Sequence, residues 1–248
     1  MVQLRQFRAA ATVLVLAGGL AVGTAGPAGA ASSDVAAAAA GTIQKRDVPK
    51  DYKKTASLQT QAGPPPAGEG EASFEEQTKD IPACADFKEI FEPSSPSITA
   101  SADGASFDQG GALTGSELSG STLVFSSTAA AKKFFAPIKS AQYATCLEDA
   151  MQASMAQGAD DTTTYQSTIE PTTSPKLGDE SVAFRIAVAA TSTDPAAPFT
   201  TDFHFQFVYS RVGRGIGVYV ALSMGDPDPA ASAKANTAAV ARFERALG

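Results

Sequence analysis

The chain has few of the residues on which enzymatic and metal-binding sites most often depend. Its 248 residues include no tryptophan, one histidine (His204) and two cysteines. A serine hydrolase needs a base, usually histidine, and the sequence has no Gly-x-Ser-x-Gly motif. A closed zinc site would need carboxylates besides two cysteines and one histidine. Phosphate-binding loops and dinucleotide glycine motifs are also missing. We therefore expect no catalytic residues, no cofactor and no metal site.

Basic residues are outnumbered by acidic ones, with 19 lysines and arginines against 26 aspartates and glutamates. The formal net charge is −7. Nucleic acids require a basic protein surface, so we expect no nucleic-acid partner. Adsorption to anionic lipid is disfavoured for the same reason.

Long hydrophobic runs are scarce, and the one that stands out lies near the N-terminus. Arg5 and Arg8 precede the apolar run 9–22, and the small residues 28–30 form a cleavage site. This order predicts a signal peptide over residues 1–30. The run is too short to cross a bilayer comfortably, so we expect no stable membrane insertion after cleavage. The mature chain, with a charge of −9 once the two arginines are removed, is predicted to be secreted and extracellular, either free or associated with the cell wall.

The segment 31–80 has the composition of a flexible tether rich in alanine, proline and glycine. Alanines fill 36–40, and the Gly-Pro-rich stretch 63–68 cannot enter a helix or a central strand. Few large apolar residues are present to offset the entropy of ordering. Between these stretches lies a basic cluster: Lys45, Arg46, Lys50, Lys53 and Lys54. A solvated linker is the preferred interpretation, and an arm drawn to anionic wall polymer is the alternative.

The two cysteines, Cys84 and Cys146, both lie inside the predicted exported part. In an oxidising compartment an even number of cysteines favours a disulfide. A thiolate metal site or nucleophile is the competing interpretation.

Residues 81–248 have the pattern of one globular domain. The strongest periodicity lies in 182–224, where apolar residues alternate with polar or small ones and predict three strands with one apolar face. The apolar positions are Val182, Phe184, Ile186, Val188, Phe203, Phe205, Phe207, Tyr209, Ile216, Val218, Val220 and Leu222. Gly213 predicts a hairpin between the last two strands.

Helical spacing and a further short strand complete this domain. Residues 84–91 are predicted to form a short helix and 123–125 a buried strand. A serine or threonine at 126–128 is expected to cap a helix that is interrupted at Pro137 and ends near Gly158. A last helix starts near Pro229 and carries an apolar stripe to Leu247. Strands joined by a hairpin and flanked by helices predict an α+β fold, an antiparallel β-sheet packed with helices and held by one disulfide.

The second face of the three strands is the candidate binding surface. It carries Arg185, His204, Gln206 and Tyr219 among small residues such as Ala187. Small side chains leave room above a sheet, and the four larger groups can bind a polar or anionic head group. A merely solvated sheet face is the alternative.

The order of these features resembles the extracellular PknH-like sensor domains of actinobacteria, in their secreted stand-alone form. The resemblance spans residues 81–248. Its motifs are Pro82-Ala83-Cys84, Leu123-Val124-Phe125, Ala129-Ala130-Ala131-Lys132-Lys133-Phe134, Tyr143-Ala144-Thr145-Cys146-Leu147, Leu177-Gly178-Asp179-Glu180 and Val212-Gly213. It implies a mixed α/β sandwich with a cleft for an extracellular ligand, and no catalysis. The second disulfide, transmembrane helix and kinase domain of the kinase-linked members are not found in this sequence.

These observations predict a secreted, non-enzymatic, sensor-like domain that binds a small extracellular or envelope-derived ligand. One alternative is an envelope interaction or structural protein that binds a protein or a wall polymer. A secreted hydrolase with two catalytic carboxylates is a third class.

Overall fold

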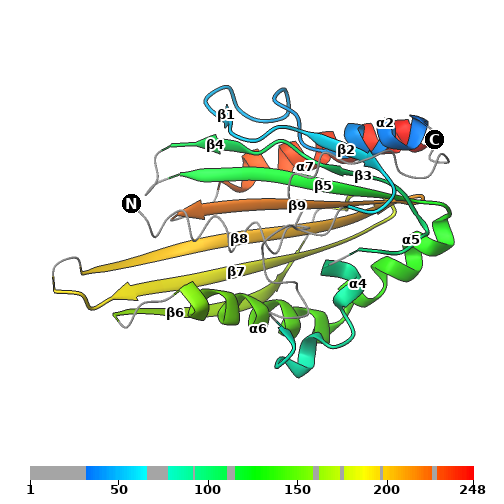
Figure 1. The fold of residues 1–248 in the computed structure, drawn as a ribbon. Helices are drawn as coiled ribbons and strands as arrows, with labels where there is room; N and C mark the ends of the chain where they lie inside the picture. The colour runs from blue at the N-terminus through cyan, green and yellow to red at the C-terminus, as the bar shows by residue number, and fades with distance from the viewer. Residues whose placement is uncertain are drawn as a thin grey trace.

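The computed structural model describes residues 32–65, 78–91, 93–110, 115–158, 162–173, 176–195, 198–224 and 228–248 (Figure 1). The predicted signal peptide, 1–30, lies outside the described residues. Within them, no helix is both long and apolar enough to span a membrane.

A single antiparallel sheet organises the described chain. Its strands are β1 (Lys53–Lys54), β2 (Gln59–Ala62), β3 (Ile98–Asp103), β4 (Phe107–Gln109), β5 (Ser116–Phe125), β6 (Thr163–Thr172), β7 (Glu180–Ser192), β8 (Phe199–Val212) and β9 (Gly215–Met224). The main order is β1-β4-β5-β9-β8-β7-β6, and β3 pairs with both β2 and β5.

Helices cover both faces of this sheet (Figure 1). They are α2 (Ser32–Gly41), the 3-10 turn η1 (Pro82–Cys84), α4 (Lys88–Phe91), α5 (Thr128–Phe135), the 3-10 turn η2 (Pro137–Lys139), α6 (Ala141–Gly158) and α7 (Pro229–Leu247). The predicted α+β class, with an antiparallel sheet and one disulfide, is confirmed.

The three predicted strands are β7, β8 and β9, and their register explains why one face is so apolar. Ile186 lies opposite Phe205, and Phe207 lies opposite Val220, so alternate side chains of neighbouring strands meet on the same face. Gly213 takes a φ of 54° in the β8–β9 turn. Because this left-handed conformation suits glycine, the predicted hairpin forms there.

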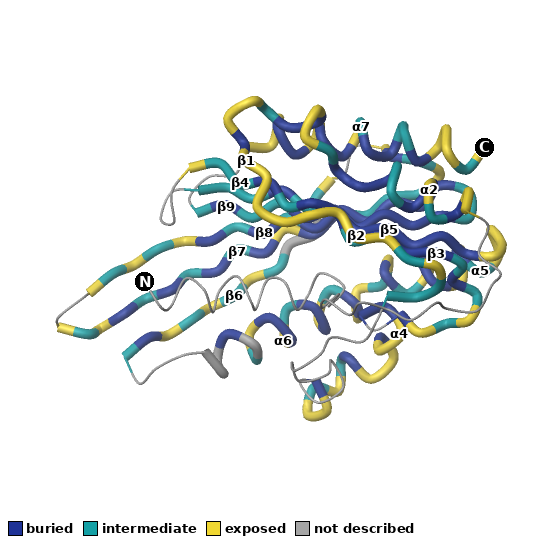
Figure 2. The backbone as a smooth tube through the Cα atoms, turned by 45° about the horizontal axis from the view of Figure 1, so that its top comes forward, coloured by how far each residue is buried: buried dark blue, intermediate teal, exposed yellow. Residues whose placement is uncertain are grey.

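The two faces of the sheet carry separate clusters of buried side chains, which we call the α6 face and the α7 face. On the α6 face, Phe184, Phe205 and Phe207 join residues of α4, α5 and α6. On the α7 face, Val208 and Tyr219 join residues of α2 and α7. Figure 2 shows the sheet between these helix layers, with the buried residues concentrated along its middle.

The tether prediction is wrong for residues 32–65, which are part of the fold. The alanine run lies in α2, where Ala37 and Ala38 are buried against the layer that includes α7. Farther along, Ile43 and Tyr52 are also buried. Alanine has little apolar surface, so a run of alanines in a sequence does not indicate burial. Its small volume nevertheless lets two helices approach closely. Residues 66–77, which include the end of the Gly-Pro-rich stretch 63–68, lie outside the described residues.

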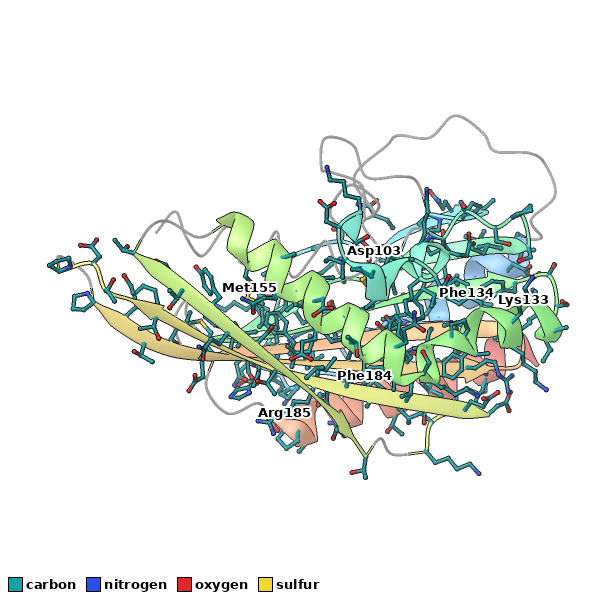
Figure 3. All side chains as sticks on the ribbon, turned by 90° about the horizontal axis from the view of Figure 1, so that it is seen from below. Asp103, Lys133, Phe134, Met155, Phe184 and Arg185 are labelled. Carbon is teal, nitrogen blue, oxygen red and sulfur yellow. A yellow bond between two sulfur atoms is a disulfide. The ribbon has the colours of Figure 1, made fainter. Side chains whose placement is uncertain are left out.

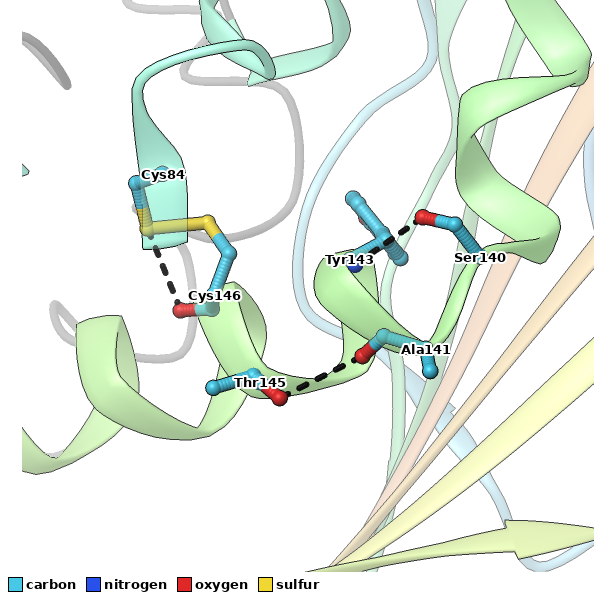
Figure 4. Close-up of a disulfide and its surroundings, with 6 residues drawn as sticks. All are labelled: Cys84, Ser140, Ala141, Tyr143, Thr145 and Cys146. Atoms are coloured by element: carbon cyan, nitrogen blue, oxygen red, sulfur yellow. Dashed lines mark hydrogen bonds between the residues drawn. A yellow bond between two sulfur atoms is a disulfide. The ribbon is translucent and has the colours of Figure 1, made fainter. Parts of the chain in front are cut away.

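The predicted disulfide between Cys84 and Cys146 is confirmed and joins η1 to α6 (Figure 4). The two Cα atoms lie 4.7 Å apart, and both side chains are buried. The bridge therefore fastens the 78–91 segment to the helix that covers the α6 face.

The break between α5 and α6 lies where the sequence predicts it. Ser127 is the N-cap of α5, and its side chain accepts a hydrogen bond from the amide of Ala130. Pro137 begins the turn η2, after which Ser140 Oγ accepts a hydrogen bond of 3.1 Å from the amide of Tyr143 (Figure 4). Each helix thus begins with a hydroxyl that satisfies a free amide.

Candidate functional site

The four predicted binding residues lie on three neighbouring strands and point to the α7 face. Arg185 on β7 is the register partner of Gln206 on β8. His204 precedes Gln206 by two residues on the same strand, and Tyr219 lies on β9 opposite Val208. Their common face follows from the alternation of a strand, but helices cover only part of it. The four residues therefore have very different environments.

Arg185 and His204 are together at the uncovered part of the face. Nη2 of Arg185 lies 3.3 Å from Nδ1 of His204. Arg185 is exposed and His204 is half-buried. Figure 3 shows Arg185 on the side of β7 away from α6, while its neighbour Phe184 belongs to the α6-face core. Since a guanidinium only donates, this hydrogen bond requires Nδ1 of His204 to be unprotonated.

Gln206 lies at the border of the covered region. Its Oε1 accepts a hydrogen bond of 3.2 Å from Oγ of Ser232, in the first turns of α7. Ser232 is itself buried, and Gln206 is half-buried. The amide therefore joins the helix to the sheet and is less available to a ligand than the Arg185–His204 pair.

Tyr219 is buried in the core, contrary to the expectation that it faces a ligand. Its hydroxyl donates a hydrogen bond of 3.0 Å to the carbonyl oxygen of Gly41, at the end of α2. Its ring covers Gly217, where an added Cβ would lie 2.5 Å from the Tyr219 hydroxyl oxygen. Burial raises the pKa of this phenol well above its usual range. Tyr219 thus holds α2 to the sheet.

The uncovered part of the α7 face, which we call the open face, consists of polar groups around small residues. Besides Arg185 and His204 it carries Ala187 and Ala189 of β7. The exposed residues Gln166 and Thr168 of β6 lie opposite these alanines, and exposed Asp202 lies two residues before His204. Guanidinium, imidazole, amide and hydroxyl groups can all bind anionic oxygens, whereas Asp202 opposes them.

Asp179, just before β7, and Glu180, its first residue, bind the buried side chain of Arg211. Nε of Arg211 donates to Glu180 at 3.0 Å, and Nη1 donates to Asp179 at 2.9 Å. Asp179 also accepts from the amide of Gly213 at 2.8 Å. Lys139 and Arg211 lower the pKa of Glu180. These contacts fix the hairpin end of β8, a structural role that alternation alone does not indicate.

Three carboxyl groups among the described residues have shifted pKa values, and each shift has its own cause. The guanidinium of Arg214 lowers the pKa of Asp34 to about 2. Burial raises the pKa of Asp103, whose Oδ1 accepts from Ser121 Oγ at 2.9 Å. None of the shifts at Asp34, Asp103 and Glu180 has another carboxyl group as its cause.

No protein-family model matches the chain, and no curated protein matches it. Among solved structures, it is similar to the crystal structure of the extracellular domain of PknH from Mycobacterium tuberculosis. The two sequences are 11% identical, the match covers 79% of this chain and 84% of that one, and the TM-score is 0.39. The predicted resemblance is thus found as a weak structural similarity. The ligand cleft that it implied stays a prediction.

Proposed function

We propose that this protein is a secreted, non-enzymatic domain of sensor-like type, which binds a small anionic ligand on the open face and acts at the cell envelope. The observation that carries the proposal is the Arg185–His204 pair on adjacent strands, with Arg185 exposed and His204 half-buried beside two alanines. Arginine is well suited to a carboxylate or phosphate because its donors form a rigid planar fork. The small neighbours leave space for the rest of the ligand.

The disulfide supports export, since such bridges persist in oxidising compartments. The alternative, an interaction protein that docks through a large apolar patch, receives less support. Among the described residues, Leu58 is the one large hydrophobic side chain that is exposed.

The proposal is tested by titrating the folded protein with inorganic phosphate and, separately, with succinate, while amide chemical shifts are followed by NMR. We expect shifts to concentrate at Arg185, Ala187 and His204. The Arg185→Ala and His204→Ala variants should each bind at least 10-fold more weakly. Asp202→Asn should bind more tightly, because it removes a negative charge beside the pair.

Two control variants distinguish loss of this site from a change in the core and from loss of positive charge elsewhere on the surface. Tyr219→Phe removes a core hydrogen bond and should leave the affinity unchanged. Lys133→Ala removes an exposed cation from α5, on the other side of the sheet, and should also bind normally. Equal affinity in Arg185→Ala and wild type, with both folded, would eliminate the open face as the binding site.

A further inference from the structure

We propose that four exposed cations between α2 and β2 form a docking site for a linear phosphate-bearing polyanion, independent of the open face. The residues are Arg46, Lys50, Lys53 and Lys54, and we call this group the basic lobe. Figure 2 shows the segment that contains β1 as an exposed loop beside α7. The tether prediction treated these charges as part of a solvated linker, but the structure attaches them to a folded surface.

The basic lobe has a local charge opposite to that of the whole protein. Residues 45–54 contain five basic and two acidic residues, although acidic residues predominate in the complete chain. Asp47 is buried and paired with Arg242, whose Nη1 and Nη2 each donate to it at 2.6 Å. Asp51 is exposed and accepts a hydrogen bond from the neutral side-chain amide of Gln109, which leaves its charge in place. The exposed charge of the segment is still positive, because five cations are exposed beside one carboxylate.

The next carboxylate along the sheet leaves this surplus largely in place. Asp108 on β4 is the register partner of Lys53, and its Oδ1 accepts from Oγ1 of Thr55 at 3.1 Å, so this one carboxylate offsets only part of the charge of the four cations. Within the described part of the chain, the four cations of the basic lobe form no ion pair. Their charges are thus available to a ligand.

The backbone that carries these cations is held in place by internal contacts. Lys45 donates from Nζ to the carbonyl oxygens of Pro49, Lys50 and Tyr52. Tyr52 is buried, and its hydroxyl shares a hydrogen bond of 2.6 Å with Ser116 Oγ. Arg242 additionally donates to the carbonyl oxygens of Ala40 and Thr42, at 3.1 and 2.7 Å.

A fixed backbone favours binding, because a ligand that binds a flexible arm must also order the backbone of that arm. A surface that is already ordered loses less conformational entropy when a ligand arrives. The cations also lie on an exposed loop and a short strand rather than around a buried pocket. This arrangement suits a ligand with repeated charges along a chain, whose bound counterions are released on contact.

A linear polymer fits the charge distribution better than an anionic membrane does. A membrane presents its charge to a whole side of the protein, so the acidic residues outside the basic lobe would be repelled. A narrow polymer can follow the four cations and avoid those carboxylates. Leu58 is exposed near the basic lobe, but a single leucine supplies little membrane affinity.

The test uses the complete mature chain and long-chain inorganic polyphosphate, with binding measured by fluorescence anisotropy at 50 and 200 mM salt. We expect wild-type binding to weaken steeply with salt, as for other polyanion sites. A variant with Arg46→Gln, Lys50→Gln, Lys53→Gln and Lys54→Gln should lose at least 10-fold in affinity at 50 mM salt and most of the salt dependence.

The matched control removes the same number of charges elsewhere. It carries Lys79→Gln, Lys132→Gln, Lys133→Gln and Lys176→Gln, four exposed positions outside the basic lobe, and should bind polyphosphate within 2-fold of wild type. Arg185→Ala should also bind it normally, so that failure of the open-face proposal is distinguishable. If the quadruple variant is unstable, Arg46→Gln with Lys50→Gln provides a milder test.

Three results would overturn the proposal. Equal losses in the two quadruple variants would show that overall charge governs the interaction. Full affinity in the basic-lobe variant would show that polyphosphate binds elsewhere. Binding to vesicles of anionic phospholipid, without binding to polyphosphate, would identify the surface as a membrane contact instead.

Discussion

Arg214 in the β8–β9 turn and Asp34 at the start of α2 are 180 positions apart and form a two-pronged ion pair. The Nη1–Oδ2 distance is 2.9 Å and the Nη2–Oδ1 distance is 2.6 Å. Nη1 also donates to the carbonyl oxygen of Phe125, and Thr99 donates to Asp34 at 2.6 Å. One arginine thereby joins the first described helix to the turn at the end of the central strands.

This ion pair predicts a loss of stability in acid. The pKa of Asp34 is lowered from 3.8 to about 2 in the folded state. The free energy that the ion pair adds to folding is therefore present in full above pH 4 and is lost as the pH falls through 2. The shift corresponds to about 2 kcal/mol. In urea unfolding, Asp34→Asn should be less stable than wild type by at least that amount at pH 5, and the gap should narrow towards pH 2.

A second carboxyl group provides the control for this measurement. Asp86 is exposed, so Asp86→Asn should show no comparable gap at pH 5. A gap between wild type and Asp34→Asn that stays constant from pH 5 to pH 2 would contradict the assigned role of the ion pair.

Helix α2 should tolerate a larger side chain in place of alanine only on its exposed face. Ala38 is fully buried in the layer that contains α7, whereas Ala36 on the same helix is exposed. Ala38→Leu should cost about 1–3 kcal/mol in free energy of unfolding, because a well-packed interior has no room for three more carbons. Ala36→Leu should change it by about 0.5 kcal/mol or less. Similar values for both variants would contradict the packing of α2 into the core.

Helix α2 also differs from the central strands in how far the sequence reveals its burial. Strands β7, β8 and β9 could be predicted because their alternation records burial on one face residue by residue. Burial of α2 could not, since alanine gives the same weak signal in a linker as in a close helix contact. Polar strands such as β6, with the sequence Thr-Thr-Tyr-Gln-Ser-Thr-Ile-Glu-Pro-Thr, lack a clean apolar period for a related reason. Their stability comes from pairing with a neighbour rather than from their own pattern.

The candidate site could likewise be predicted only in part. The shared face of Arg185 and His204 follows from strand period, and the structure places the two side chains 3.3 Å apart. The apolar stripe of α7 is visible in the sequence, but its period does not tell which part of the sheet the helix covers. Gln206 and Tyr219 therefore shared the predicted face, although helices cover them in the fold.

The disulfide should contribute substantially to stability. Cys84 and Cys146 are 62 positions apart, and closing a loop of that size contributes about 4 kcal/mol in the chain-entropy model. The double variant Cys84→Ala/Cys146→Ala should lose about that amount in urea unfolding. Wild type in the presence of a reductant strong enough to open the bridge should match it. A double variant as stable as the oxidised wild type would show that the bridge adds no net stability.

Gln152 of α6 lies against the outer side of β6 and satisfies two backbone groups of that strand. Its Nε2 donates to the carbonyl oxygen of Tyr165 at 3.0 Å, and its Oε1 accepts from the amide of Ser167 at 3.1 Å. These are the contacts that a neighbouring strand would make. Among the described strands β6 is at the end of the sheet, where unsatisfied edges tend to pair with another chain.

We therefore expect Gln152→Ala to expose this edge to a second copy of the protein. Residues 163–169 carry no charge that would oppose pairing between two copies. The variant should exchange the Ser167 amide proton faster and form dimers or larger species as its concentration rises, measured by hydrogen exchange and light scattering. Gln152→Glu keeps an acceptor for Ser167 and adds a charge at the edge, so it should stay monomeric under the conditions in which wild type is monomeric. Gln166→Ala, which changes an exposed side chain of β6 and leaves its backbone contacts intact, is the control. If Gln152→Ala remained monomeric alongside this control, the side chain would have no part in protecting the edge.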